Sequence, residues 1–206
     1  MIAIIDYGMG NLGSIHNMLS RIGSASVITS DKGDIESADK VILPGVGAFD
    51  NAMINLDRLN LIPTLKAKVI DKKTPILGIC LGMQLFSRNS EEGRLPGLGW
   101  IDAQTVRFRF DADHANLKIP HMGWNTIEVK RRGSILDGMY EVSRFYFVHS
   151  YHVRCNDESN VLATTTYGIT FHSAITKDNI IGTQFHPEKS HKFGLKLLRN
   201  FVEDSL

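Results

Sequence analysis

Short apolar segments alternate with amphipathic ones through the first half of this chain. The strand-like segments are IAIIDYG, ASVITS, KVILPG and PILGIC, and the helical stretches between them include LGSIHNMLSRIG and NLIPTLKAKVIDKK. Parallel strands need crossover connections, and those crossovers cover the faces of the sheet. We therefore expect an α/β fold with a mostly parallel central sheet and helices on both faces. Its functional edge should lie at the carboxyl ends of the strands.

After residue 95 the pattern changes to shorter β-rich segments. They are WIDAQTVRFRF, WNTIEVK, FYFVHSYHV, VLATTTY and NIIGTQF, and an amphipathic helix follows near 190–204. We expect these strands to be antiparallel additions to the same sheet. Residues 111–118, DADHANLK, form the most polar stretch of the middle region and should be a surface loop. The length of 206 residues, without a linker or an internal repeat, favours a single domain over residues 1–206.

Charge and cysteine content argue against several classes of protein. With 23 Lys plus Arg against 22 Asp plus Glu, a formal net charge of +1 offers no field for nucleic acid or an anionic membrane. No apolar run approaches the ~20 residues that a membrane-spanning helix needs. Cys80 and Cys155 form no metal-type pair, and the N-terminus does not resemble a signal peptide. We expect a cytoplasmic protein without nucleic-acid or membrane partners.

The sequence GICLG, from Gly78 to Gly82, places Cys80 between an apolar strand and a helix. Serine hydrolases hold their nucleophile in a similar setting, G-x-S-x-G, because small neighbours leave room for a sharp, strained turn. A helix that begins just after the sulfur also favours the thiolate. We predict that Cys80 is a nucleophile. The alternative is a buried, inert cysteine, since free cysteine is among the most buried residue types.

The sequence QFHPE, near the C-terminus, offers a base for that nucleophile. Pro187 pushes His186 toward extended backbone, and in an extended strand His186 and Glu188 point to the same face. Glu188 would then fix the tautomer of His186, which completes a nucleophile, base and orienter with Cys80. A metal pair or a solvated strand end is the alternative. We expect no metal, because no third ligand has a recognisable spacing.

The segment PGVGAF, residues 44–49, ends the third predicted strand and should lie at the same sheet edge as Cys80. Attack of a thiolate on an amide creates an oxyanion, which preorganised N–H groups stabilise. We assign those donors to the backbone of Val46 and Leu81. Gly45 should let the Gly45–Val46 peptide rotate, so that the oxyanion hole can form on activation. The alternative is that this segment is a simple turn.

In this order and with these separations, PGVGAF, GICLGMQL and QFHPEKS resemble the class I, triad-type glutamine amidotransferases over nearly the whole chain. Within that family, YGMGNLGS, PHMGWN and FVHSY are most similar to the glutaminase subunits of imidazole glycerol phosphate synthases, of histidine biosynthesis. The resemblance implies a flavodoxin-like sheet, hydrolysis of L-glutamine and no cofactor. It also implies a separate (β/α)₈ synthase subunit that receives the ammonia through a channel.

The resemblance assigns roles by position. Cys80 matches the nucleophile, His186 the general base and acid, and Glu188 the residue that orients the histidine. The implied glutamine pocket consists of Gly47, Gln84, Glu92 and the Ser150–Tyr151 backbone. Gln84 also has a local rationale, because it follows Cys80 by four residues and shares its helical face. For Glu92 and Ser150, ordinary surface residues are the alternative.

The resemblance further implies a docking face for the synthase. Its residues are Asn11, Trp124, Tyr146 and Lys189. Trp124 is the most informative of them, because a large aromatic side chain among Gly, His and Asn is either core or an interface anchor. The family match favours the interface.

Other hypotheses compete with glutamine hydrolysis for a histidine-pathway synthase. Residues 8–13, GMGNLG, fit the dinucleotide pattern G-x-G-x-x-G, with Asp31 about 20 residues on, although the family uses this loop at the partner interface. An independent cysteine hydrolase or peptidase would share the triad but need no partner. A binding subunit with a vestigial triad, or a paralogue that feeds ammonia to a sugar-amidating synthase, are the remaining alternatives.

Overall fold

The strand order of the central sheet confirms the predicted α/β architecture. The structure, a computed structural model, describes residues 1–131 and 135–203. Within these ranges an eight-stranded sheet has the order β2-β1-β3-β4-β12-β11-β10-β7. Its parallel strands are β1 (Ile2–Ile5), β2 (Ser26–Thr29), β3 (Lys40–Gly45), β4 (Ile76–Cys80) and β12 (Ile180–Thr183). Their order, β2-β1-β3-β4-β12, is that of a flavodoxin-like sheet.

The direction of β12 corrects one expectation. The segment NIIGTQF was expected to add an antiparallel strand, but β12 runs parallel to β4, with Gly182 beside Gly78. A short buried strand has the same pattern in either direction, and the direction depends on how the chain returns to the sheet. This arrangement brings the end of β12, which QFHPE follows, to the same edge as Cys80.

The antiparallel part of the structure is more divided than the sequence suggests. The strands β11 (Ile169–Lys177), β10 (Val161–Tyr167) and β7 (Glu128–Val129) extend the sheet, and β11 is not among the predicted segments. Two separate ladders pair β5 (Ala103–Arg107) with β9 (Tyr151–Cys155), and β6 (His121–Thr126) with β8 (Arg144–His149). The expectation of one sheet is wrong for these four strands. Alternation fixes the face that a side chain takes, but not which strand lies alongside.

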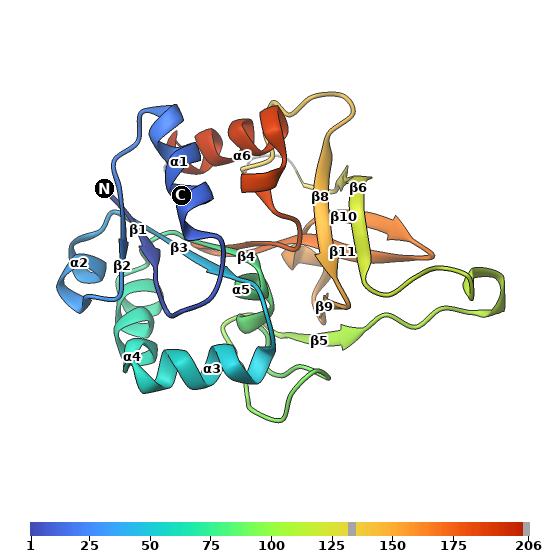
Figure 1. Cartoon of the computed structure of the whole chain (residues 1–206), viewed down its shortest axis with the longest axis horizontal. Coiled ribbons are helices and arrows are strands. Elements are labelled where there is room, and N and C mark those ends of the chain that lie inside the picture. Colours follow the sequence, from blue (N-terminus) through green and yellow to red (C-terminus); the bar gives the residue numbers. More distant parts are fainter. Residues whose placement is uncertain (132–134, 204–206) are drawn as a thin grey trace.

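Helices cover both faces of the sheet, as predicted (Figure 1). One face carries α1 (Leu12–Ile22) and α6 (His191–Glu203). The other carries α2 (Lys32–Ser37), α3 (Phe49–Arg58) and α4 (Leu61–Lys66), which continues as a π-helical turn at Ala67–Asp71. The short helix α5 (Leu81–Leu85) follows β4 directly. α6 matches the helix predicted near 190–204, of which residue 204 lies outside the described residues.

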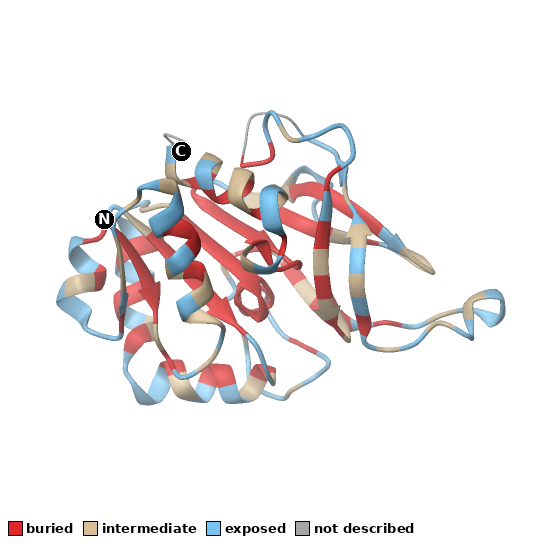
Figure 2. Ribbon diagram, turned by 45° about the horizontal axis from the view of Figure 1, so that its top comes forward, coloured by how far each residue is buried: buried red, intermediate tan, exposed pale blue. Residues whose placement is uncertain are grey.

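The strands supply the core by alternating their side chains. On β1, Ala3 and Ile5 are buried in one cluster, and Ile2 and Ile4 in the other. Figure 2 shows the buried residues concentrated in the strands, with exposed residues on the outer sides of the helices. Residues 111–118 form an exposed loop, as predicted, with only a short 3₁₀ turn. No helix in the described ranges is long and apolar enough to span a membrane.

Gly82 is a position next to Cys80 at which an added methyl group should destabilise the fold. A Cβ there would overlap the Leu43 carbonyl oxygen. We expect Gly82→Ala to push α5 away from β3 and to lower the free energy of unfolding by about 3 kcal/mol, measured by urea titration. Gly13→Ala is the matched control, because no atom lies within 4 Å of its Cβ, and in α1 it should add ~0.5–1 kcal/mol. Equal changes in the free energy of unfolding for the two variants would contradict the close contact between Gly82 and Leu43.

Candidate active site

Cys80 lies in a strained turn between β4 and α5. It has φ 55° and ψ −107°, a conformation that residues other than glycine rarely adopt. The packing explains both flanking glycines, because a Cβ on Gly78 would overlap the Phe86 ring and one on Gly82 would overlap the Leu43 carbonyl. The predicted elbow is present, and the packing of β3 and α5 holds it in its strained form.

The two cysteines have different surroundings. Cys80 is 6% exposed, and its Sγ lies 3.7 Å from Gln184 Nε2 and 4.0 Å from the Val148 carbonyl oxygen. Cys155 lies on β9, where burial, with a smaller effect from the Glu158 carboxylate, raises the pKa of its thiol to about 12. The Cys155 thiolate is therefore rare at neutral pH, and Cys80 is the better candidate for a nucleophile.

His186 and Glu188 contact each other just beyond β12. His186 has extended backbone, φ −101° and ψ 96°, as Pro187 predicts. Glu188, however, lies in a 3₁₀ turn at Pro187–Lys189 and not in an extended strand, which corrects the geometry expected for this pair. The turn still brings Glu188 Oε1 to 2.8 Å from His186 Nδ1, with both side chains 1% exposed. The bond fixes the ring and leaves Nε2 for the sulfur.

Opposing effects set the pKa of His186. Burial lowers it, whereas the negative charges of Cys80 and Glu188, and the hydrogen bond to Glu188, raise it to about 10. The imidazole is therefore protonated at neutral pH and pairs electrostatically with the Cys80 sulfur. A protonated imidazole can give its proton to a leaving amine.

The segment after β3 lies beside Cys80, as predicted. β3 and β4 pair in parallel with Gly45 opposite Cys80. The Pro44 carbonyl oxygen accepts a 2.6 Å hydrogen bond from Tyr7 Oη, and Tyr7 is fully buried. The chain is therefore anchored immediately before the Gly45–Val46 peptide, so any rotation of that peptide must occur beyond this anchor.

The two predicted oxyanion donors lie on either side of the elbow. Val46 is 47% exposed and follows Gly45, while Leu81 begins α5, where a backbone N–H has no intrahelical acceptor. Gly47 has φ 124°, a conformation that favours glycine. These positions are compatible with an oxyanion hole between the end of β3 and the start of α5.

The loop that resembles a dinucleotide-binding pattern supports this segment. A Cβ on Gly10 would lie 3.1 Å from Pro44 Cβ, and one on Gly47 would lie 2.6 Å from Met9 Cε. Asp31 caps α2, because its Oδ1 accepts a 3.1 Å hydrogen bond from the Asp34 N–H. The glycine-rich loop and Asp31 thus have local structural roles.

Gln84 and Tyr151 are in direct contact, which brings together two parts of the predicted glutamine pocket. Gln84 Nε2 donates to the Tyr151 carbonyl oxygen at 3.1 Å and to Gln184 Oε1 at 3.1 Å. Both amide hydrogens of Gln84 are therefore used, and its Oε1 is the atom left for a ligand. Ser150 separates β8 from β9, and its carbonyl oxygen accepts a hydrogen bond from the Phe108 N–H.

A chain of neutral histidines also holds the Tyr151 carbonyl. That oxygen can only accept, so His149 Nδ1, at 2.8 Å, is its donor and His149 Nε2 is unprotonated. His149 Nε2 then accepts from His121 Nδ1 at 3.0 Å, and His121 Nε2 accepts from Asn125 Nδ2 at 3.3 Å. Burial lowers the pKa of His121 to about 4 and that of His149 well below its ordinary value, which keeps both rings neutral.

Glu92 has a structural partner. Its Oε2 accepts a 2.9 Å hydrogen bond from the N–H of Phe49, the first residue of α3. Burial raises the pKa of Glu92 above its ordinary value, and the hydrogen bond from Phe49 only partly opposes this effect. Glu92 therefore ties its loop to the start of α3, two residues after Gly47, and is not a free surface carboxylate.

Three of the four predicted docking residues form one cluster at the surface. The Trp124 side chain is on β6, 44% exposed, with its ring stacked on His191 at 5.5 Å and 6.4 Å from the Tyr146 ring. Lys189 Nζ lies 5.6 Å from the Tyr146 ring centre. The Tyr146 carbonyl accepts a 2.9 Å hydrogen bond from the His186 N–H, so this cluster adjoins the predicted base. Asn11, the fourth, precedes α1.

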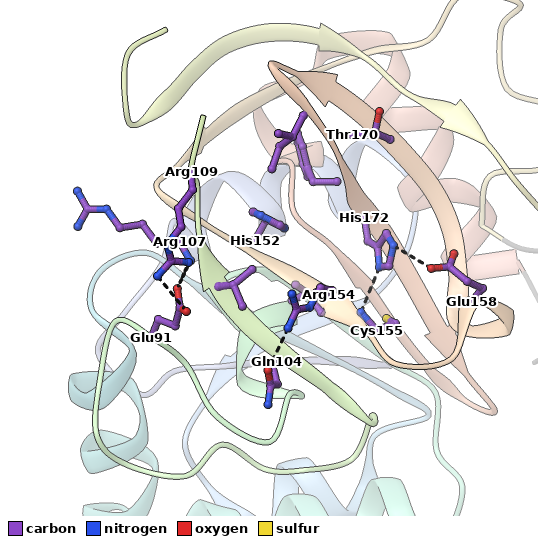
Figure 3. A pocket seen from close by; sticks show the side chains of 14 residues that line it. Glu91, Gln104, Arg107, Arg109, His152, Arg154, Cys155, Glu158, Thr170 and His172 are labelled. Atoms are coloured by element: carbon purple, nitrogen blue, oxygen red, sulfur yellow. Dashed lines mark hydrogen bonds and ion pairs between the residues drawn. The ribbon is translucent and has the colours of Figure 1, made fainter. Parts of the chain in front are cut away.

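A cavity of about 520 Å³ lies apart from the triad, between β5, β9 and β11 (Figure 3). Glu91 and Arg109 form an ion pair of 2.8 Å at its rim, and Glu158 lies 3.5 Å from His172. Arg154 Nη2 donates to Gln104 Oε1 at 3.4 Å, and Arg107 lies over the Tyr151 ring. None of the predicted pocket residues lines this cavity, so the reactive side chains, and not the cavity, define the site.

Sequence reasoning missed several residues that hold the site together. Gln184 contacts the sulfur, Tyr7 anchors the oxyanion segment, and His121 and His149 support the Tyr151 carbonyl. Each lies within a quoted motif, in QFHPE, YGMGNLGS, PHMGWN and FVHSY respectively. Their types were visible, but their contacts cross between distant segments.

The chain belongs to the class I glutamine amidotransferases. The family model described as "Glutamine amidotransferase class-I" matches residues 3–205. "Imidazole glycerol phosphate synthase subunit HisH 2" of Methanococcus maripaludis is 57% identical over 205 residues, which cover 100% of both chains. The protein of the same name in Pseudomonas aeruginosa is 49% identical, covering 98% of this chain and 99% of that one. "Imidazole glycerol phosphate synthase subunit HisH" of Leptospira interrogans is 43% identical with the same coverage.

Solved structures share the fold at lower identity. A putative GMP synthase protein of Thermoplasma acidophilum has a TM-score of 0.71 at 21% identity, covering 98% of this chain and 91% of that one. The structure of PurLQS from Thermotoga maritima has a TM-score of 0.72 at 16% identity, covering 98% of this chain and 96% of that one. These likenesses place the fold among those of glutamine amidotransferases.

Glu188→Gln should lower the pKa of His186 from about 10, because it keeps the shape of the side chain but removes one of the charges that raise that pKa. NMR titration of the His186 imidazole measures this shift. We also expect glutaminase kcat to fall about 10²-fold or more. An unchanged His186 pKa would contradict the role of Glu188.

The same pKa predicts a dependence of stability on pH. Because the folded pKa of His186 is raised from 6.5 to about 10, its contribution to stability is complete below pH 6.5 and is lost as the pH rises through about 10. The free energy of unfolding should therefore fall between pH 7 and 10, and less so in Glu188→Gln. Urea titrations of both proteins across this range provide the comparison, and parallel curves would be evidence against it.

Proposed function

We propose that this chain, over residues 1–206, is the glutaminase subunit of an imidazole glycerol phosphate synthase, of histidine biosynthesis. It hydrolyses L-glutamine to glutamate and passes the ammonia to a (β/α)₈ synthase subunit in a heterodimer. The observation that carries the proposal is the meeting of Cys80 and His186 at one sheet edge, with Glu188 2.8 Å from the imidazole. Relatives of 43–57% identity that are named as subunits of this synthase support the choice of acceptor.

The reaction begins with attack of the Cys80 thiolate on the side-chain amide carbon of glutamine. The carbonyl oxygen becomes an oxyanion, which the N–H groups of Val46 and Leu81 stabilise. When the C–N bond breaks, protonated His186 gives its proton to the departing ammonia and a thioester remains. Neutral His186 then takes a proton from water, and the hydroxide hydrolyses the thioester to release glutamate and restore the thiolate–imidazolium pair.

The glutamine pocket lies beside Cys80, with Gln84 and the β8–β9 turn on one side and the segment after β3 on the other. Gln84 Oε1 and the Ser150–Tyr151 backbone supply polar groups on one side, and Gly47 lets the substrate approach the backbone after β3. Glu92 offers a carboxylate for the α-ammonium group of glutamine, held in place by its bond to the Phe49 N–H.

The synthase docks on the cluster of Trp124, Tyr146 and Lys189, together with Asn11. The half-exposed indole is a suitable anchor for a protein interface. His186 is bonded through its backbone to Tyr146, so ammonia would be released next to the docked partner and not into solvent.

Cys80→Ala tests the chemistry. In the complex it should abolish synthase activity with glutamine, while activity with added ammonium salt stays at the wild-type rate, because the nucleophile is lost and docking is not. An unchanged Tm in calorimetry shows that the fold is intact. Continued hydrolysis of glutamine would overturn the assignment of Cys80, and turnover of peptides or esters but not glutamine would favour an independent cysteine hydrolase.

Trp124→Ala tests the docking face. We expect it to weaken binding of the synthase subunit by about 2 kcal/mol, roughly 30-fold in Kd, as measured by calorimetry. Ile54→Ala is the matched control, since Ile54 is 51% exposed on α3, a different element of the surface. Equal Kd values for both variants would place the interface elsewhere. If the chain co-purifies with a sugar-amidating enzyme, that enzyme is the acceptor of the ammonia, and the triad chemistry is unchanged.

A further inference from the structure

Gln184 is a polar side chain outside the triad that contacts the sulfur of Cys80. It is fully buried, two residues before His186, and its Nε2 lies 3.7 Å from the Cys80 sulfur. Its Oε1 is 3.1 Å from Gln84 Nε2. The side chain thus spans the distance between the sulfur and the predicted glutamine pocket.

The surrounding hydrogen bonds determine which end of the Gln184 amide faces the sulfur. The Tyr151 carbonyl oxygen can only accept, so the group of Gln84 that faces it must be the NH₂ group. The second hydrogen of that NH₂ group points to Gln184, which must present its oxygen in return. Gln184 is therefore left with an N–H directed at Cys80.

The other polar neighbour of the sulfur has the opposite character. The Val148 carbonyl oxygen, at 4.0 Å, can accept a hydrogen bond from a thiol but has nothing to donate to a thiolate. Gln184, at 3.7 Å, is a donor and suits the thiolate. Of these two contacts, the one from Gln184 favours the reactive form.

We propose that Gln184 is a further catalytic residue, whose side-chain N–H hydrogen-bonds the Cys80 thiolate and holds it toward His186. The inference deepens the proposed function and rests on Cys80 being its nucleophile. Because Gln184 is anchored by Gln84, the sulfur is also held in register with the glutamine pocket. The hydrogen bond from Gln184 weakens when the sulfur loses its negative charge on forming the thioester. It strengthens again when hydrolysis of the thioester regenerates the thiolate.

Alkylation of Cys80 by iodoacetamide tests this without glutamine or a partner subunit. Gln184→Leu removes the donor, and Gln184→Glu keeps the shape and the acceptor for Gln84 but offers no amide N–H. Loss of a hydrogen bond to a charged group predicts alkylation at pH 7 that is about 10- to 100-fold slower in both variants. In the complex, kcat with glutamine should fall by a similar factor, with KM changed less than about 3-fold.

Thr183→Val is the matched control. Thr183 is fully buried as the last residue of β12, directly before Gln184, and its hydroxyl donates to the Phe185 carbonyl, not to the sulfur. Its alkylation rate should stay within about 2-fold of wild type. A wild-type rate in folded Gln184→Leu, or equal slowing in Thr183→Val, overturns the proposal. If Cys80→Ala also lacks glutaminase activity while Gln184→Leu alkylates normally, Gln184 fails but the proposed function stands.

A measurement on unaltered Gln184 covers the case in which its variants do not fold. The side-chain amide of Gln184, assigned by triple-resonance NMR, should show a large change in its N–H shift between the wild type and Cys80→Ala. Gln184 shifts that match in the two proteins would show that the amide does not bond to the sulfur.

Discussion

The close packing of β3 against the turn at Cys80 is the constraint on which the site depends. Gly82 lies directly under the Leu43 carbonyl oxygen, and Gly45 is opposite Cys80 in the β3–β4 register. Strain of the kind seen at Cys80 costs of the order of 1–3 kcal/mol and persists only where the surroundings fix it. Here the buried core on both faces of the sheet fixes it, so the sulfur is presented on a rigid edge.

Two chains of hydrogen bonds meet at the Tyr151 carbonyl oxygen. One runs from Asn125 on β6 through His121 and His149, and the other runs from Cys80 through Gln184 and Gln84. β6 also carries Trp124 of the proposed docking face. β6 and Cys80 are therefore joined through contiguous polar contacts, and both chains of hydrogen bonds support the Tyr151 backbone of the proposed glutamine pocket.

Local patterns were sufficient to predict the first half of the fold and to propose the reactive residues. The apolar segments of β3 and β4 and the glycines on either side of Cys80 are local signals, and the structure places them in a strand–turn–helix elbow. The direction of β12, the separate β5–β9 and β6–β8 ladders and the 3₁₀ turn at Glu188 were not predictable in this way. Strand pairing and strand direction depend on segments that are far apart in the chain. The alternation of buried and exposed side chains along a strand is the same whichever strand lies beside it.

The sequence by itself determined the family and the candidate reactive groups, because Cys80, His186 and Glu188 are recognisable by type and by the local backbone that Gly and Pro impose. Only the tertiary structure decided how those groups are tuned. The pKa of His186 depends on burial and on charges from two other segments, and the donor on the sulfur comes from the orientation of Gln184, which the Tyr151 carbonyl sets through Gln84. Both depend on distances between residues that the order of the chain does not contain.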